Sequence, residues 1–115
     1  MDKMRSLLTL TPKLLAATAQ HKLVWSRHPP AGTAYSVSLG DVYVLVWEWT
    51  DGNSPETSGV SAQLKTSQEV ILDAVICDEY DPNYRQVRDL YLAARRSALN
   101  VDSVIADIER KIDLL

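Results

Sequence analysis

Apolar and polar residues alternate with two different periods along this chain. Near the N-terminus, apolar residues recur every three or four positions, and the alanines that follow also favour a helix. Thr11 and Pro12 fit the N-cap and the first helical position, so we predict a helix over about 12–20.

The last third of the chain has the same helical period. It predicts one helix over about 82–98, with Asp81 as its N-cap, and a final helix capped by Asp102. Asn100, between the two helices, suits the left-handed conformation in which many helices end. The final helix carries an apolar stripe, which we expect to face the core: Val104, Ile105, Ile108, Ile112 and Leu115.

The middle of the chain has the period of two that is typical of strands. Runs at 33–39 and 42–49 flank Gly40-Asp41, which predicts a hairpin with a two-residue type II′ turn. This turn sets the register: Leu39 faces Val42, Val37 faces Val44 and Tyr35 faces Val46. These six residues share one face, which we expect helices to cover. The opposite face consists of Ala34, Ser36, Ser38, Tyr43, Leu45, Trp47 and Trp49.

Further segments lie on either side of this hairpin: strands at 22–26 and 60–65, and loops at 27–32 and 51–59. Residues 69–77 are rich in Val, Ile and Leu, which favours a strand. Thr66-Ser-Gln-Glu69 would instead fit a capping box that opens a helix, and we predict the strand. The complete order is an N-terminal helix, an antiparallel meander of four to five strands and two C-terminal helices. We therefore predict a single α+β domain over residues 1–115.

Three features define this layout: an N-terminal helix that leads into a strand with Leu23-Val-Trp25, a hairpin, and a two-helix tail from Asp81 to Asp102. In this layout the chain resembles a group of short uncharacterised bacterial α+β proteins of unknown function. The resemblance covers most of the chain and implies the same fold. It implies no activity and no catalytic residues, because the group has none to carry over.

The composition fits an ordinary globular protein. With 46% hydrophobic and 23% charged residues, the 115-residue chain can bury its own core. A net charge of −3 argues against nucleic-acid binding, because such proteins normally need a basic surface. Residues 41–81 carry nine acidic residues against Lys65 alone. We expect them to neighbour the more basic segments or, alternatively, to meet a basic partner.

The chain has one cysteine, no secretory signal and no apolar window long enough to span a membrane. We therefore expect a cytoplasmic protein without membrane contact. Its partner would be another protein or a second copy, and a small ligand is possible.

Candidate catalytic and metal-binding residues are few. His21 and His28 have no partner at a metal-binding spacing. Cys77 lies in an apolar run beside two acidic residues, whose charges would raise its thiol pKa, so we predict a structural cysteine. The acidic residues of 78–81 lack the ligand spacing of a calcium loop. We therefore predict no catalytic residues, no metal and no cofactor.

The basic residues concentrate on the predicted helix over 82–98, at Arg85, Arg88, Arg95 and Arg96. Such a face could contact phosphate. Asp81 and Asp89 lie among these arginines at ion-pairing spacing. We therefore favour a solvated and partly paired helix face.

Tyr43, Trp47 and Trp49, with Ser36 and Ser38 beside them, are the most informative set. Either the final helix packs over the aromatics as core, or they form an interface, where Trp and Tyr are enriched. We predict a non-catalytic protein-interaction or regulatory module that acts as a homodimer or as a subunit. One alternative is a small-molecule-binding protein or enzyme with a cleft between sheet and helices. The other is an acidic chaperone or immunity-like protein that masks a basic partner.

Overall fold

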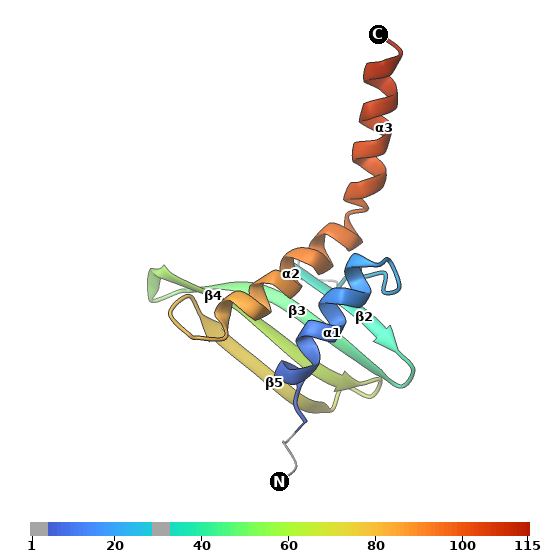
Figure 1. Ribbon diagram of the computed structural model, residues 1–115. Coiled ribbons are helices and arrows are strands. Elements are labelled where there is room, and N and C mark those ends of the chain that lie inside the picture. Colours follow the sequence, from blue (N-terminus) through green and yellow to red (C-terminus); the bar gives the residue numbers. More distant parts are fainter. Residues whose placement is uncertain (1–4, 29–32) are drawn as a thin grey trace.

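The computed structural model describes residues 5–28 and 33–115, apart from the side chains of residues 54–56. Its elements are α1 (Leu7–Ala19), β1 (Ser26–Arg27), β2 (Ala34–Leu39), β3 (Val42–Asp51), β4 (Ser54–Thr66), β5 (Ile71–Asp78), α2 (Tyr84–Ala98) and α3 (Val101–Asp113). The described strands form one antiparallel sheet in the order β1-β2-β3-β4-β5. Helices α1 and α2 lie on one face of the sheet, and α3 leads away from it (Figure 1). The predicted α+β order of elements is confirmed.

The core lies between α1, α2 and one face of the sheet. Val44 and Val46 of β3, Val60 of β4 and Leu90 of α2 are completely buried there. Tyr35 of β2 joins them, with its ring centroid 5.8 Å from that of Tyr91 of α2. The hairpin face that we expected helices to cover is therefore core over most of its length. It becomes more exposed only at the Leu39–Val42 end, next to the turn.

The β2–β3 hairpin has the predicted register. Leu39 pairs with Val42, Val37 with Val44 and Tyr35 with Val46. Gly40 has a φ of 68°, whereas Asp41 is not among the described residues with a positive φ. A positive φ at the first turn position alone is what a type II′ turn requires.

Helix α1 begins earlier than predicted. Ser6 is its N-cap and forms a capping box with Thr9, so Thr11 does not begin the helix and Pro12 lies inside it. Proline has no N–H, which leaves the carbonyl of Leu8 without its helical donor. Gln86 of α2 supplies the replacement, because its Nε2 donates to the Leu8 carbonyl at 2.9 Å. The packing of α2 against α1 thus supplies a hydrogen-bond donor to the Leu8 carbonyl.

The first strand also differs from the prediction. It is Ser26–Arg27 rather than 22–26, because Trp25 turns into the core, where it is 2% exposed. Its indole Nε1 donates to Thr18 Oγ1 at 2.9 Å, and its backbone N–H donates to Ser97 Oγ at 3.0 Å. Trp25, which directly precedes β1, therefore links α1 to α2. The predicted loop at 27–32 lies largely outside the described residues.

The predicted loop at 51–59 is mostly strand. Strand β3 continues to Asp51 and β4 begins at Ser54, so the expected strand at 60–65 is only the second half of a longer one. The polar residues pair across the hairpin, with Thr50 opposite Ser58 and Trp49 opposite Gly59. This hairpin extends beyond the helices at the left of Figure 1. Polarity here marks an exposed hairpin end, not a loop.

Residues 69–77 were predicted as a strand, and β5 (Ile71–Asp78) confirms it. The capping-box pattern that precedes it closes a tight turn. Thr66 Oγ1 accepts from the backbone N–H groups of Gln68 and Val70, at 3.3 and 3.1 Å. Glu69 takes a left-handed φ of 71° in this turn.

The two predicted C-terminal helices form, but their caps differ. Helix α2 begins at Tyr84 with Asn83 as N-cap, and Asp81 accepts from the Asn83 N–H at 2.8 Å in the preceding turn. Asn100 has the predicted left-handed conformation, with φ 55°, and is itself the N-cap of α3. Asp102 lies in the first turn of α3 rather than at its cap.

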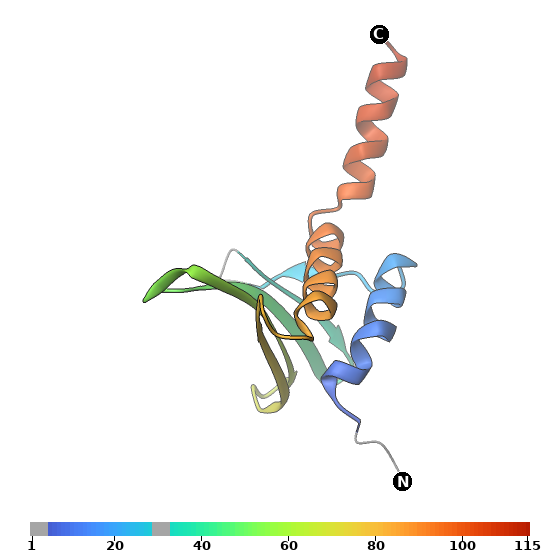
Figure 2. The ribbon, with the colours of Figure 1, turned by 60° about the vertical axis from the view of Figure 1, so that its left-hand side comes forward.

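The expectation that the final helix packs its apolar stripe into the core is wrong. All thirteen residues of α3 are described, and none is buried. The chain turns at Asn100, so α3 extends away from both the sheet and the other helices (Figure 2). Among the described elements, α3 contacts α2 alone. Ile105 remains 42% exposed and Ile112 60% exposed.

Candidate functional site

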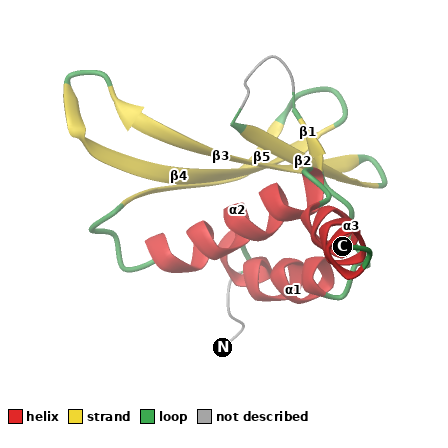
Figure 3. Ribbon diagram, turned by 90° about the horizontal axis from the view of Figure 1, so that it is seen from above, coloured by secondary structure: helices red, strands yellow, loops and turns green. Residues whose placement is uncertain are grey.

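The predicted aromatic surface lies on the sheet face opposite α1 and α2. Tyr43 is buried, Trp47, Trp49 and Ser36 are half-buried, and Ser38 is exposed. In the part of the chain that the structure describes, no helix covers this face (Figure 3). The alternative in which the final helix packs over the aromatics is therefore not realised. Their role as an interface stays a prediction.

Trp49 is held by its own sheet. Its indole Nε1 donates to Ser61 Oγ at 3.0 Å, and its ring lies against Gly59, the residue opposite it on β4. A Cβ at position 59 would collide with this ring and with the carbonyl of Cys77. Glycine is needed here because it lets the indole lie flat on the strand.

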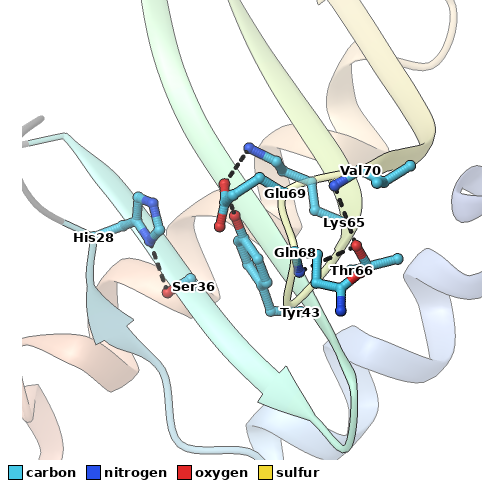
Figure 4. A network of polar contacts seen from close by, with 8 residues as sticks. All are labelled: His28, Ser36, Tyr43, Lys65, Thr66, Gln68, Glu69 and Val70. Atoms are coloured by element: carbon cyan, nitrogen blue, oxygen red, sulfur yellow. Dashed lines mark hydrogen bonds and ion pairs between the residues drawn. The ribbon is translucent and has the colours of Figure 1, made fainter.

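A polar cluster occupies the other end of this face (Figure 4). Tyr43 Oη donates to Glu69 Oε2 at 2.7 Å, and Lys65 Nζ lies 2.8 Å from the same oxygen. His28 stacks on Tyr43 with ring centroids 5.8 Å apart, and its Nδ1 lies 3.2 Å from Ser36 Oγ. We call these five residues the Tyr43 cluster.

The sequence did not indicate the Tyr43 cluster, because its members come from β2, β3, β4 and two turns. His28 is half-buried against Tyr43. The only local signal was the spacing of four between Lys65 and Glu69, which in a helix would also permit an ion pair.

The cluster stabilises its own charges. Hydrogen bonds from Lys65, and then from Tyr43, lower the pKa of Glu69. Burial, followed by the bond to Glu69, raises the pKa of Tyr43. The bond to Glu69, followed by that to Tyr43, raises the pKa of Lys65. Tyr43 thus stays protonated and Lys65 charged, which suits a clamp that holds the β4–β5 turn and not a catalytic base.

The lowered pKa of Glu69 predicts a dependence of stability on acid pH. A carboxylate with a lowered folded pKa stabilises the fold above its ordinary pKa of about 4.5, and this contribution is lost as the pH falls through the folded value. We expect Glu69→Gln to melt at a lower temperature than the wild type at pH 7. Below pH 4 the difference should shrink. Thermal unfolding from pH 3 to 7 measures it, and a constant difference would contradict the clamp.

The other titratable candidates have structural partners. Cys77 is buried, and burial, followed by Asp81, raises the pKa of its thiol. Asp78 and Asp81 each accept a backbone N–H in the turn before α2, from Tyr80 and Asn83. Within the described residues, no three His, Cys, Asp or Glu side chains are grouped so that they could hold a metal ion.

The predicted basic face lies on α2, but its pairing differs from the expectation. Arg96 pairs with Asp102 of α3, with Nη2 2.6 Å from Oδ1. His21 Nε2 lies 3.5 Å from the other oxygen of this carboxylate. The arginine bond, helped by His21, lowers the pKa of Asp102. Among the described residues, Arg85, Arg88 and Arg95 form no ion pair with Asp81 or Asp89, so that part of the expectation is wrong.

Two of the cavities that adjoin α1 lie at its two ends, and another, of about 350 Å³, lies beside its middle. One of about 780 Å³ lies between its N-terminal half and strands β4 and β5, where Asp73 Oδ2 accepts the Leu7 N–H at 2.7 Å. The other, of about 320 Å³, lies between the end of α1 and the α2–α3 junction, and we call it the base cavity. Its walls include Thr18, Leu23, Val24, Asn100 and Val101. In the larger cavity Asp73 already binds the start of α1, and Arg5 and Lys13 supply the other charged side chains of its lining.

Helix α3 is the element whose position was predicted wrongly from the sequence. Its apolar stripe has the helical period of a core helix, and the period alone does not tell an inward face from an outward one. The side chains outside the stripe pair with each other, as Asp107 does with Arg110 and Lys111 at 3.0 and 2.9 Å. The helix therefore has a polar side with its own ion pairs and an apolar side on which no residue is buried in the described structure.

Comparison with models of protein families, with curated proteins and with solved structures finds no match to this chain. The resemblance to short bacterial proteins therefore stays a prediction. Among the described residues, no helix has the length and apolarity needed to cross a membrane.

Proposed function

We propose that this chain is a non-catalytic protein-interaction module, which acts as a homodimer or as a subunit of a complex and uses α3 as its contact element. The observation that carries the proposal is the exposure of the whole apolar stripe, with Val104 51% and Ile108 49% exposed. Leaving several aliphatic side chains of one helix face in water is unfavourable, because each contributes about 1.5–3 kcal/mol when fully buried. A partner surface that covers the stripe recovers this energy.

The length of α3 supports the same conclusion. A helix of 13 residues is marginal in water unless tertiary packing stabilises it. Among the described elements, α3 packs only against α2, at their junction. The bond from Arg96 to Asp102 holds that junction, and the rest of the helix gains its stability when a partner packs on it.

The open sheet face supplies a second contact surface in this proposal. Trp47 is half-buried, as is Leu45 on the same face, and Ile76 of β5 is 68% exposed on the same side of the sheet. A large aromatic ring beside aliphatic side chains is typical of the centre of a protein interface. The hydroxyl groups of Ser36 and Ser38 lie at its border.

A capture experiment tests the proposal. The tagged chain is expected to retain a stoichiometric protein from its source cells, either a second copy or another protein. Ile105→Asp/Ile108→Asp should lower this recovery at least about tenfold, because it places two charges in the interface. Ser103→Asp/Ala106→Asp is the matched control, since it adds the same charges at the same spacing on exposed positions outside the stripe. Equal loss in both variants, or in neither, would contradict a role for the stripe.

The same capture experiment distinguishes the contribution of the open sheet face from that of α3. Trp47→Ser removes the half-buried indole ring from the sheet face and leaves α3 unchanged. Loss of the partner in this variant, with the circular dichroism spectrum retained, supports the sheet face as part of the contact. Full recovery assigns the contact to α3 alone.

A further inference from the structure

Five residues of the C-terminal segment follow the spacing of a coiled-coil seam. Steps of four, three, four and three residues separate Val101, Ile105, Ile108, Ile112 and Leu115. This alternation averages 3.5 residues and places apolar side chains at the a and d positions of heptads. We call these five residues the heptad seam. Such a narrow seam fits another helix, whose side chains interlock with it, better than it fits a flat sheet.

The heptad seam runs into the base cavity. Val101, its first residue, lines that cavity together with Leu23 and Val24. Val24 is 72% exposed, so the apolar surface continues from the helix onto the globular part of the molecule. The occupant of the seam therefore also contacts this region.

The base cavity decides the direction of the second helix. Paired helices lie about 8–10 Å apart. On the seam side of the α3 base, this space is bordered by the end of α1 and by the segment after it, which form the opposite wall of the cavity. A parallel partner would bring its own α2 and globular part to this occupied place. An antiparallel partner brings the end of its α3 that lies far from its own sheet and from its α1 and α2.

The seam is complementary to itself in the antiparallel direction. If Ile105 lies opposite Ile108 of a second copy, Val101 lies opposite Ile112, and every layer between them is aliphatic. The two-fold symmetry repeats each contact. Leu115 of the second copy then extends past Val101 and reaches the base cavity.

The charges beside the seam permit this arrangement. Antiparallel pairing places Glu109 of the second copy near Asp102. Two carboxylates would repel each other there, but Arg96 and His21 already lie within 2.6 and 3.5 Å of the Asp102 oxygens. Arg96 is 54% exposed in its side chain, so it can also reach a second carboxylate.

We infer that two copies of this chain pair through antiparallel α3 helices, and that the base cavity of each copy receives the C-terminal leucines of the other. The inference rests on the proposed function and names its partner. A two-heptad seam is small, so the buried area lies at the low end for specific interfaces, about 1,200 Å². The dissociation constant is accordingly expected to be on the order of micromolar.

Cross-linking tests the direction. Val101→Cys and Ile112→Cys variants are mixed and treated with a short bismaleimide, with the wild type, whose Cys77 is buried, as control. The antiparallel pair yields cross-links between the two different variants, because positions 101 and 112 face each other. A parallel pair yields cross-links only within each variant, since 101 and 112 then lie about 16 Å apart along the helix. The second result overturns the arrangement.

Sedimentation equilibrium from about 1 to 200 µM tests the association itself. The wild type should dimerise, and Ile108→Asp should raise the dissociation constant at least about 100-fold, because it places a charge in each central layer. Ala106→Asp, on the exposed side, should leave it unchanged. A wild type that stays monomeric but captures another protein through α3 overturns the self-pairing and leaves the proposed function standing. A dimer that survives Ile108→Asp overturns both.

Discussion

Trp25→Ala is expected to lower the free energy of unfolding by about 3–5 kcal/mol, the usual cost of replacing a buried large aromatic with alanine. Trp25 is among the largest fully buried side chains. Its indole N–H donates to Thr18 of α1, and its backbone is bound to Ser97 of α2. The substitution therefore leaves a cavity where both helices meet the sheet. Urea unfolding followed by circular dichroism measures the loss.

Trp25→Phe is the matched control for the polar contact. It keeps an aromatic ring in the core and removes the indole donor together with the volume of the second ring. Thr18 Oγ1 still donates to the Leu14 carbonyl at 2.8 Å, so this hydroxyl remains satisfied. The expected cost is about 1–2 kcal/mol. If Trp25→Phe lowered the free energy of unfolding as much as Trp25→Ala does, the indole hydrogen bond would contribute more to stability than the packing of the ring.

Gly59→Ala is expected to lower the free energy of unfolding by about 1–3 kcal/mol, although it adds a single methyl group. The new Cβ would collide with the Trp49 ring on one side and with the backbone carbonyl of Cys77 on another. The ring can move, at the expense of its bond to Ser61. The carbonyl cannot, since it belongs to the neighbouring strand. A red shift of tryptophan fluorescence should therefore accompany the loss of stability.

Gly52→Ala is the matched control. Gly52 lies at the tip of the same hairpin, and nothing lies within 4 Å of a Cβ added there. Its free energy of unfolding should change by less than about 0.5 kcal/mol, as for most surface substitutions. Equal effects at the two glycines would mean that backbone freedom, and not the contact with Trp49, determines the cost.

Local chemistry made the hairpin and the order of elements predictable. Gly40-Asp41 sets the register by turn geometry alone, and the alternation of residues around it separates a covered face from an open one. The strand at 69–77 was predictable for a similar reason, because its β-branched residues outweigh the capping pattern before it.

The starts and the placement of the helices depend on distant residues and could not be predicted. Pro12 fits a first helical position by local rules, yet it lies inside α1 because Gln86 replaces the missing donor. The apolar stripe of α3 has the pattern of a core helix, yet the turn at Asn100 leads it away from the sheet. The Tyr43 cluster joins side chains from several strands and turns, and its geometry exists only in the folded sheet.

Two hydrogen-bond partners of the α1 backbone come from distant residues, and this determines when the helix becomes stable during synthesis. Its first N–H is bound by Asp73, 66 residues later in the chain, and the carbonyl opposite Pro12 is bound by Gln86, 78 residues after Leu8. Helix α1 thus leaves the ribosome before Asp73 and Gln86 and lacks these two hydrogen-bond partners until they have followed. Closing such long loops is slow compared with forming local contacts. Helix α1 precedes the sheet in the chain and is therefore expected to become stable only after the sheet and α2 have formed.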